Sequence, residues 1–203
     1  MQLPTERTPA SRKSPRLLTL FGQSKVGKTT TLATLDNCLI IDTEQGTDMV
    51  DAMKVQANSL QDVMAVLKAL REKEEKYDYI ALDTVDNIVN WMEEFVCQSE
   101  GVKTIGDLDF GKGYAMVRDN VMKILSQLKP LATKGVILIG HRKKTLIANE
   151  TDIKVNTSSL DLSGKLKNFI MADSDAIGYV FRNGEGELKV SFIADDETEA
   201  GAR

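Results

Sequence analysis

The sequence predicts an α/β fold in which a mostly parallel β-sheet is flanked by helices. Two patterns support this fold class. Short apolar runs alternate along the chain with longer segments whose apolar residues recur at helical spacing, and such alternation favours a parallel core. The run Val136-Ile137-Leu138-Ile139 is continuously apolar and mostly β-branched, which is typical of a strand buried on both faces of a parallel sheet.

The first half of the chain predicts three strands, each followed by a helix. Apolar runs predict strands over 16–21, 38–43 and 79–83, and helical spacing predicts helices over 27–35, 59–73 and 86–97. Ser59, with Asp62 three residues later, can cap the second of these helices. A helix after each strand provides the crossover that a parallel pair requires.

The second half predicts one more strand of this kind and then antiparallel elements. We expect a loop over 101–113, a helix over 114–131, a fourth strand over 135–140, a hairpin of 145–148 with 153–156, a helix over 162–171, and a hairpin of 177–182 with 187–193. Asn183-Gly184-Glu185-Gly186 supplies the turn of the last hairpin. The sheet is therefore expected to carry a C-terminal antiparallel hairpin extension.

The chain length of 203 residues suits one domain with short tails. Three of the four prolines lie in the first 15 residues among Ser, Thr and Arg, which predicts a flexible N-terminal arm over 1–15. Acidic and then small residues predict a disordered acidic tail over 195–203. The domain itself is expected to span 16–194.

Composition argues against several classes of protein. Hydrophobic residues make up 42% and charged residues 28%, an ordinary mixture for a chain that forms a core. No apolar run approaches the ~18 residues needed to cross a bilayer and no signal peptide is visible, so we expect a cytoplasmic protein without membrane contact. Two cysteines without CxxC spacing and one histidine argue against a zinc site. The net charge of −4 confines any nucleic-acid contact to a local patch.

One motif has a specific chemical meaning. The segment Gly22-Gln23-Ser24-Lys25-Val26-Gly27-Lys28-Thr29 matches the pattern G-x-x-x-x-G-K-[ST] and lies between an expected strand and an expected helix. Glycines allow backbone N–H groups to turn inward around phosphate oxygens. Lys28 would reach the β- and γ-phosphates, and the Thr29 hydroxyl would hold Mg²⁺. The residues expected to bind the nucleotide are Gly22, Gln23, Ser24, Lys25, Val26, Gly27, Lys28, Thr29 and Thr30.

Acidic residues at the ends of two expected strands would complete this site. Asp83 ends the run Tyr79–Asp83, and a carboxylate there would hold Mg²⁺ together with Thr29, with Asp86 as a less favoured substitute. Glu44 follows the strand 38–43, and strand C-termini form the ligand crevice of such sheets. Two interpretations of Glu44 are open at this point: it polarises an attacking water, or it is a solvated loop acid.

Several of these segments together resemble a known family. Gly22 to Thr30, Ile41-Asp42-Thr43-Glu44 and Leu82-Asp83-Thr84 resemble the RecA-like branch of P-loop ATPases. Asp109 to Tyr114 and Gly140-His141 resemble the compact RecA-like ATP-binding proteins of bacteriophages, some of which serve as single-strand annealing proteins.

The resemblance covers about residues 16–193 and implies a fold, two cofactors and two residue roles. It implies a RecA-like P-loop NTPase core that uses ATP and Mg²⁺, with Glu44 as the catalytic base. His141 would be a sensor of the γ-phosphate, and the alternative is a strand-end histidine whose ring bonds to backbone. The chain lacks an evident RecA-style oligomerisation segment and a separate C-terminal domain, which leaves filament formation open.

The densest basic cluster of the chain follows His141. In RecA-like proteins the segment after the sensor strand contacts single-stranded DNA, so the resemblance implies DNA contacts from Arg142, Lys143, Lys144 and Lys154. A solvated turn is one alternative. Another is a cation that reaches the γ-phosphate of a neighbouring subunit, for which Lys165 and Lys167 are further candidates.

A glycine-rich loop before the helix 114–131 is a further candidate contact. Lys112 and Tyr114 lie in this loop. They would contact a nucleotide base or DNA, or they belong to a flexible turn with a packed tyrosine.

We expect a Mg²⁺-dependent ATPase that acts on single-stranded DNA in phage recombination or annealing. It would work as a homo-oligomer in the cytoplasm of a bacterial host. The alternative is a nucleotide-dependent switch module that controls a protein partner without binding DNA, which the acidic net charge favours. A kinase is a third interpretation, but it usually needs an arginine-rich lid, and only Arg118 and Arg142 lie between Arg71 and Arg182.

Overall fold

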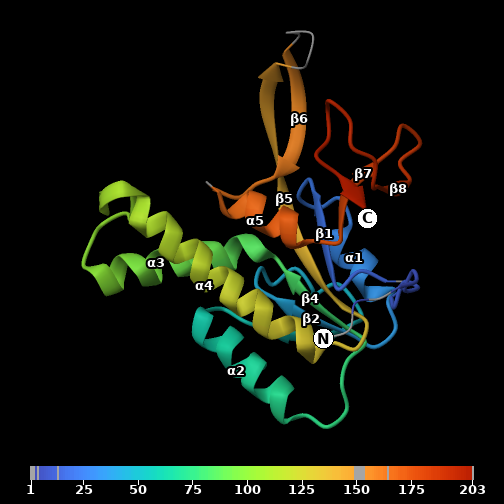
Figure 1. The fold of residues 1–203 in the computed structure, drawn as a ribbon, viewed down its shortest axis with the longest axis horizontal. Coiled ribbons are helices and arrows are strands. Elements are labelled where there is room, and N and C mark those ends of the chain that lie inside the picture. The colour runs from blue at the N-terminus through green and yellow to red at the C-terminus, as the bar shows by residue number, and fades with distance from the viewer. Residues whose placement is uncertain (1–2, 4, 13, 149–153, 164, 203) are drawn as a thin grey trace.

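The computed structural model describes residues 3, 5–12, 14–148, 154–163 and 165–202. Its central sheet has the strand order β3-β2-β4-β5-β1-β7-β8, with β6 paired to β5 and β9 paired to β7 (Figure 1). The strands are β1 Leu17–Gly22, β2 Cys38–Asp42, β3 Met53–Gln56, β4 Tyr79–Asp83, β5 Gly135–Ala148, β6 Lys154–Leu160, β7 Ala176–Arg182, β8 Leu188–Ser191 and β9 Gly201–Ala202.

The core pairs of this sheet are parallel and its C-terminal pairs are antiparallel. Strands β3, β2, β4, β5, β1 and β7 form a continuous parallel array. The pairs β5–β6, β7–β8 and β7–β9 are antiparallel. This arrangement confirms the predicted fold class, including the hairpin of β7 and β8.

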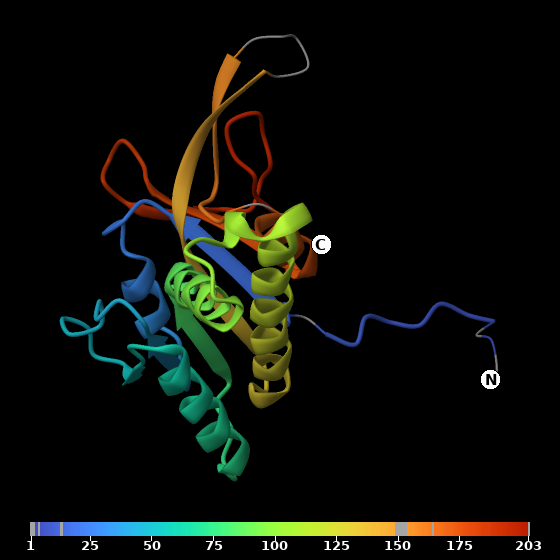
Figure 2. The same ribbon diagram turned by 90° about the vertical axis from the view of Figure 1, so that its left-hand side faces the viewer.

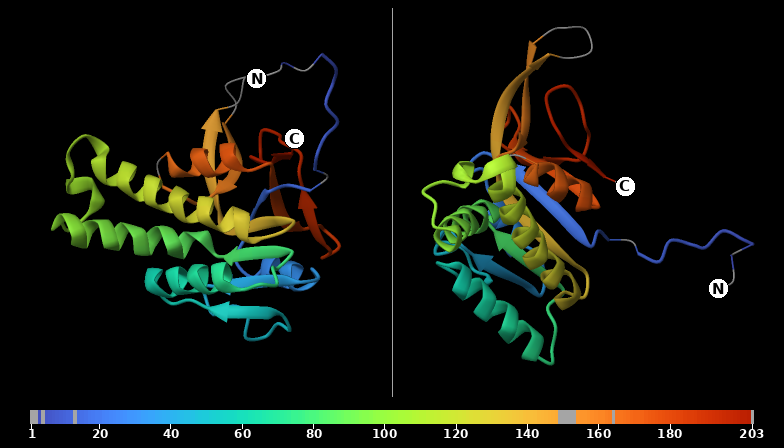
Figure 3. Two further views of the ribbon diagram at one scale, coloured as in Figure 1. Left: turned by 60° about the horizontal axis from the view of Figure 1, so that its bottom comes forward. Right: turned by 60° about the vertical axis from the view of Figure 1, so that its left-hand side comes forward.

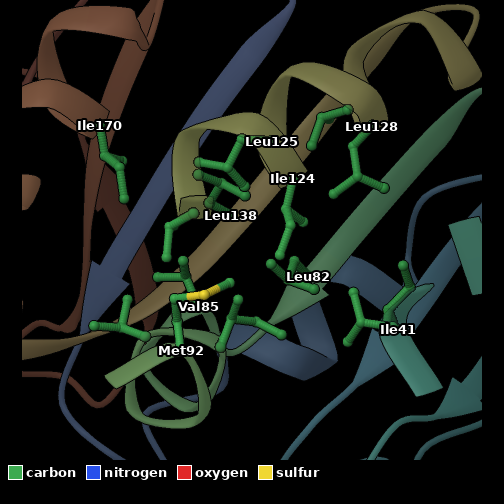
Figure 4. Packing of buried hydrophobic residues seen from close by; sticks show 14 of the residues in the cluster. Ile41, Leu82, Val85, Met92, Ile124, Leu125, Leu128, Leu138 and Ile170 are labelled. Carbon is green, nitrogen blue, oxygen red and sulfur yellow. The ribbon is translucent and has the colours of Figure 1, made fainter. Parts of the chain in front are cut away.

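Helices cover the two faces of the sheet unequally. The helices are α1 Lys28–Ala33, α2 Leu60–Glu72, α3 Val85–Glu100, α4 Lys112–Leu128 and α5 Leu166–Asp173. The larger apolar cluster joins one face of the sheet to α2, α3, α4 and α5, and Figure 4 shows Leu125 and Leu138 within it. The smaller cluster joins the opposite face to α1 through Leu32. Figure 3 shows α2, α3 and α4 lying side by side along the sheet.

Local sequence signals explain where two of the helices begin and end. The Ser59 side chain accepts a hydrogen bond from the backbone N–H of Asp62, so the predicted cap of α2 is confirmed. Helix α3 ends at Gly101, whose φ of 67° lies in the left-handed region that glycine adopts without strain.

Two strands differ from the sequence-based expectation. Strand β5 continues from the core to Ala148, and its outer part pairs with β6 in a ribbon that projects from the body of the molecule (Figures 1 and 2). The expected hairpin of 145–148 with 153–156 is therefore part of a longer one, and its tip lies outside the described residues. Strand β3 was not expected, because it is an edge strand of four residues with three exposed side chains.

The two chain ends differ from each other. Before Leu17 the described residues form no helix or strand, and the arm extends away from the domain in Figure 2. The expectation of a disordered tail over 195–203 is wrong for the described residues, since β9 pairs with Ala176 and Ile177 of β7. Composition suggested disorder there, but Thr198 and Ala200 are buried against the domain.

None of the helices in the described part of the chain combines the length and apolar character needed to cross a membrane.

Candidate functional site

The loop with the phosphate-binding motif joins the end of β1 to the start of α1. Its backbone turns through two left-handed positions, Lys25 with φ 61° and Gly27 with φ 117°. A Cβ at Gly22 would lie 2.5 Å from the carbonyl oxygen of Val180, so only glycine fits against β7 there. The motif therefore lies between a strand and a helix, as its function requires.

Lys28 is buried within this loop, with 6% of its surface exposed. Its ammonium group donates to the backbone oxygens of Gly22, at 3.2 Å, and Gln23, at 3.0 Å. Burial lowers the pKa of Lys28, while the charges of Asp83, Glu44 and Asp86 act in the opposite direction.

Thr29 and Asp83 meet across the strand ends, although they are 54 positions apart in sequence. The Thr29 hydroxyl donates to a carboxylate oxygen of Asp83 at 2.5 Å. Burial raises the pKa of Asp83, and the neighbouring carboxylates of Glu44 and Asp42 raise it further. A hydroxyl and a buried carboxylate are a donor set that fits Mg²⁺, which prefers oxygen ligands and keeps much of its coordination for water and phosphate.

Asp42 organises the loop after β2. Its buried carboxylate accepts hydrogen bonds from the backbone N–H groups of Glu44, Gly46 and Thr47 and from the Thr47 hydroxyl. Burial acts to raise the pKa of Asp42, but these four hydrogen bonds outweigh it, and the pKa lies below its ordinary value. Asp42 therefore fixes the position from which Glu44 projects.

His141, the last residue of β5 that pairs with β1, lies beside two carboxylates. Its Nε2 lies 3.6 Å from Oε1 of Glu44, and its Nδ1 lies 3.5 Å from Oδ2 of Asp86. Asp86 also accepts the His141 backbone N–H at 3.3 Å. The hydrogen bond that the His141 ring donates to Asp86 is the main cause that raises the pKa of His141, and the charges of Asp86 and Glu44 add to it. Glu44 also accepts from the Thr84 hydroxyl at 3.1 Å.

The basic residues after His141 have different surroundings. Arg142 donates to the Tyr179 hydroxyl at 2.9 Å. Lys143 lies 3.8 Å from Asp161 in an exposed pair, and Lys144 is exposed. Lys154 begins β6, but its side chain lies outside the described part of the structure.

Two of the remaining candidate cations form ion pairs with carboxylates of the same chain. Lys112 pairs with Glu100 at 2.7 Å, and Lys167 pairs with Glu199 at the same distance. Lys165 is exposed at the start of α5. Tyr114 is half exposed, beside a cavity of 420 Å³.

The structure thus brings together Lys28, Thr29, Asp83, Glu44 and His141 at the C-terminal ends of β1, β4 and β2 and at the point where β5 leaves the parallel sheet. Sheet order explains this, because Gly22 pairs with His141 and Asp42 pairs with Asp83 at the same edge. Sequence analysis missed the roles of Thr84 and Asp86 as partners of Glu44 and His141. The one local signal was their position just after Asp83, at the start of the next helix.

Comparison with known proteins identifies the family. The model of the family AAA_24, described as an AAA domain, matches residues 14–203. The chain belongs to this AAA domain family. Together with the strand order, in which β5 separates the motif strand β1 from β4, this confirms the resemblance to RecA-like P-loop ATPases.

The AAA domain chain is also similar to a curated protein of Bacillus subtilis (strain 168), the SPbeta prophage-derived uncharacterized protein YorG. The two are 24% identical over 182 residues, which is 85% of this chain and 52% of YorG. The chain therefore spans about half the length of this relative.

Three solved structures are similar to the chain at a low level. The RadB recombinase has a TM-score of 0.49 and 12% identity, covering 87% of each chain. The flagellar accessory protein FlaH of Methanocaldococcus jannaschii has a TM-score of 0.42 and 12% identity, covering 90% of this chain and 83% of FlaH. The P4 protein of bacteriophage phi6, solved with ADP, has a TM-score of 0.39 and 15% identity, covering 94% of this chain and 62% of P4.

Proposed function

We propose that this AAA domain protein is a Mg²⁺-dependent ATPase that acts on single-stranded DNA. The observation that carries the proposal is the meeting of Thr29 and Asp83 beside the buried Lys28, with Glu44 on the neighbouring strand end. This set holds the three groups that phosphoryl transfer to water needs: a phosphate cradle, oxygen ligands for a metal and a base.

Each side chain has one task in this proposal. The loop amides and Lys28 bind the phosphates of ATP, and Thr29 and Asp83 hold Mg²⁺, which neutralises charge on the phosphates when bound. Glu44 accepts the proton of the attacking water. His141 of β5 lies 3.6 Å from the carboxylate of Glu44. A change at the γ-phosphate that moves Glu44 can therefore reach β5 through this histidine.

Support for action on DNA comes from the projecting ribbon of β5 and β6. Strand β5 leads directly from His141 to the exposed lysines Lys143 and Lys144. Cations on a projecting ribbon can follow a phosphate backbone. The prophage origin of YorG supports a phage setting for this activity, and the role that we propose there is recombination or annealing within a bacterial host.

Homo-oligomerisation belongs to the same proposal. A cation supplied by a neighbouring copy would complete the γ-phosphate site in trans. Lys165 is the better candidate of the two lysines on α5, because it is exposed whereas Lys167 is paired with Glu199.

The second candidate function is a nucleotide-dependent switch that controls a protein partner. It is favoured by the engagement of two of the three cations after His141, Arg142 with Tyr179 and Lys143 with Asp161. The net charge of −4 favours it as well. In this case Glu44 and His141 would respond to nucleotide, but the ribbon would contact protein.

One experiment separates the two functions. Arg142, Lys143 and Lys144 are changed together to Gln, and a control changes Lys68, Lys73 and Lys76, exposed lysines in and after α2, in the same way. Affinity for a single-stranded oligonucleotide is measured over a range of salt concentrations. DNA action predicts that the first variant alone loses affinity and that its salt dependence becomes shallower. If the wild type and both triple variants have the same affinity and the same salt dependence, the protein switch is favoured.

A further inference from the structure

The hairpin of β7 and β8 lies against the phosphate-binding loop on the side opposite to Asp83. Val180 of β7 pairs with Gly22, the last residue of β1. Arg182, the last residue of β7, follows Val180 by two positions. Because β1 ends at Gly22 and the loop begins there, Arg182 lies beside the loop. Leu188 of β8 and Val26 of the loop pack against the same apolar cluster.

Distances at Gly27 show how close this contact is. A Cβ built on Gly27 would lie 3.1 Å from Cδ2 of Leu188 and 3.7 Å from Nη2 of Arg182. The Arg182 guanidinium group therefore lies next to the Gly27 turn of the loop. No sequence signal connected Arg182 with this loop, because the two are separated by most of the chain.

The charge of Arg182 is available for a ligand. Its Nη1 donates to the backbone oxygen of Gly186 at 2.7 Å, and within the described part of the chain no carboxylate lies within ion-pair distance. The nearest acid in sequence, Glu187, is engaged by Lys189 at 2.8 Å and by Asn183 at 3.0 Å. Asn183 also accepts from the backbone N–H groups of Glu185 and Glu187, which holds the turn in one conformation.

Sheet order determines which end of a nucleotide would face Arg182. In the order β2-β4-β5-β1-β7, Glu44 and Asp83 lie on one side of β1 and Arg182 lies on the other. The Mg²⁺ and water-activating groups belong at the γ-phosphate end of ATP. The nucleoside end must then extend towards β7 and β8.

From this placement, which rests on the proposed nucleotide-binding function, we infer that Arg182 binds the α-phosphate of the nucleotide within the same chain. The ligand class is a nucleoside di- or triphosphate. Arg182 and Lys28 bind opposite ends of the phosphate chain. Leu188 closes the apolar side of the loop next to Arg182.

The test measures the affinities of Mg²⁺-ATP and Mg²⁺-ADP for four proteins by titration calorimetry. They are the wild type, Arg182→Gln, Arg182→Lys and Lys189→Gln. Lys189→Gln is the charge-matched control, because Lys189 belongs to the same hairpin and follows Leu188. Arg182→Gln is expected to weaken ATP and ADP by the same factor of about ten or more, because both contain the α-phosphate and a charge-assisted hydrogen bond is lost. Arg182→Lys should recover part of this loss, and Lys189→Gln should bind as the wild type does.

Three outcomes would overturn the inference. Unchanged affinity of Arg182→Gln for both nucleotides would remove Arg182 from the site. A loss confined to ATP would place Arg182 at the γ-phosphate instead. An equal loss of nucleotide affinity in Lys189→Gln would show that the net charge of the hairpin, and not a specific contact of Arg182, is responsible.

Lys28→Ala separates failure of this inference from failure of the proposed function. If Lys28→Ala loses nucleotide and Arg182→Gln does not, the function stands and the α-phosphate contact is wrong. If the wild type itself binds neither nucleotide, both are wrong. Unfolding curves of the wild type and Arg182→Gln without nucleotide should coincide, because Arg182 is exposed and is expected to contribute to binding rather than to folding.

Discussion

At the scale of single residues, His141 connects two carboxylates, Glu44 after β2 and Asp86 in α3. Its ring lies between Glu44 and Asp86, and Asp86 also bonds to its backbone. The raised pKa of His141 means that the folded protein binds this proton more tightly than the unfolded chain does. The resulting stability is fully present below the ordinary pKa of 6.5 and is lost as the pH rises through the raised value.

Asp86→Asn tests this linkage. The variant should lower the pKa of His141. Its loss of stability, no more than about 1 kcal/mol for this partly exposed pair, should be largest below the ordinary pKa of 6.5 and should fade as the pH rises through the raised value. Because the chain contains one histidine, an NMR titration reports His141 without ambiguity. A loss that grows with pH, or an unchanged histidine pKa, would contradict the interaction of Asp86 with His141.

At the scale of elements, the four helices on one face pack against the sheet to form the larger apolar cluster. Leu125 of α4 is fully buried in the larger cluster, where it lies close to Leu138 of β5 (Figure 4). Leu146, at the outer part of β5, is 57% exposed. The same strand therefore contributes to the core at one end and to a solvent-exposed ribbon at the other.

Leucine-to-alanine changes should reveal this difference within the fold. Leu125→Ala is expected to lower the free energy of unfolding by about 2–5 kcal/mol, because it leaves a cavity between helix and sheet. Leu146→Ala should cost less than about 1 kcal/mol, since the side chain is already exposed to solvent. Urea denaturation of both variants provides the comparison, and equal losses would be inconsistent with the described packing.

At the scale of the whole molecule, the C-terminal segment joins elements that are distant in sequence. Glu197 and Glu199 exchange backbone hydrogen bonds with Ser158 of β6, and β9 pairs with β7. The Glu199 carboxylate binds Lys167 of α5 at 2.7 Å. The segment thus connects the ribbon, the last helix and the edge of the sheet.

Removal of residues 195–203 should therefore destabilise the domain. We expect a loss of about 1–3 kcal/mol, because several hydrogen bonds and two buried side chains are lost. Removal of residues 1–11 is the matched control and should change the free energy of unfolding by less than about 0.5 kcal/mol. Equal stability of the two truncated proteins would show that the C-terminal contacts contribute nothing.

Much of the fold could be predicted from the sequence, because its strong signals are local. The phosphate loop, the apolar strands and the cap at Ser59 each occupy a few consecutive residues. Strand β3 was missed, although Met53-Lys54-Val55-Gln56 alternates apolar and polar residues, because the run is short and lies at an edge. The C-terminal pairing was missed because its apolar content is small.

The candidate site was predictable up to the contacts that depend on tertiary structure. Asp83 and Glu44 follow apolar strands, and the parallel order places them near Lys28. The pairing of Asp86 with His141 spans 55 positions and leaves no local pattern. Arg182 reaches Gly27 only because β7 pairs with β1, which the sequence does not specify.

The most direct test of the central claim is the steady-state release of phosphate from ATP in the presence of Mg²⁺, with and without single-stranded DNA. The wild type should turn over ATP and accelerate with DNA. Lys28→Ala should lose turnover because the phosphates are not held. Glu44→Gln should retain ATP binding but lose turnover by about 10²-fold or more, because the base is absent. Turnover that persists in Lys28→Ala, or a Glu44→Gln protein as active as the wild type, would contradict hydrolysis at this site.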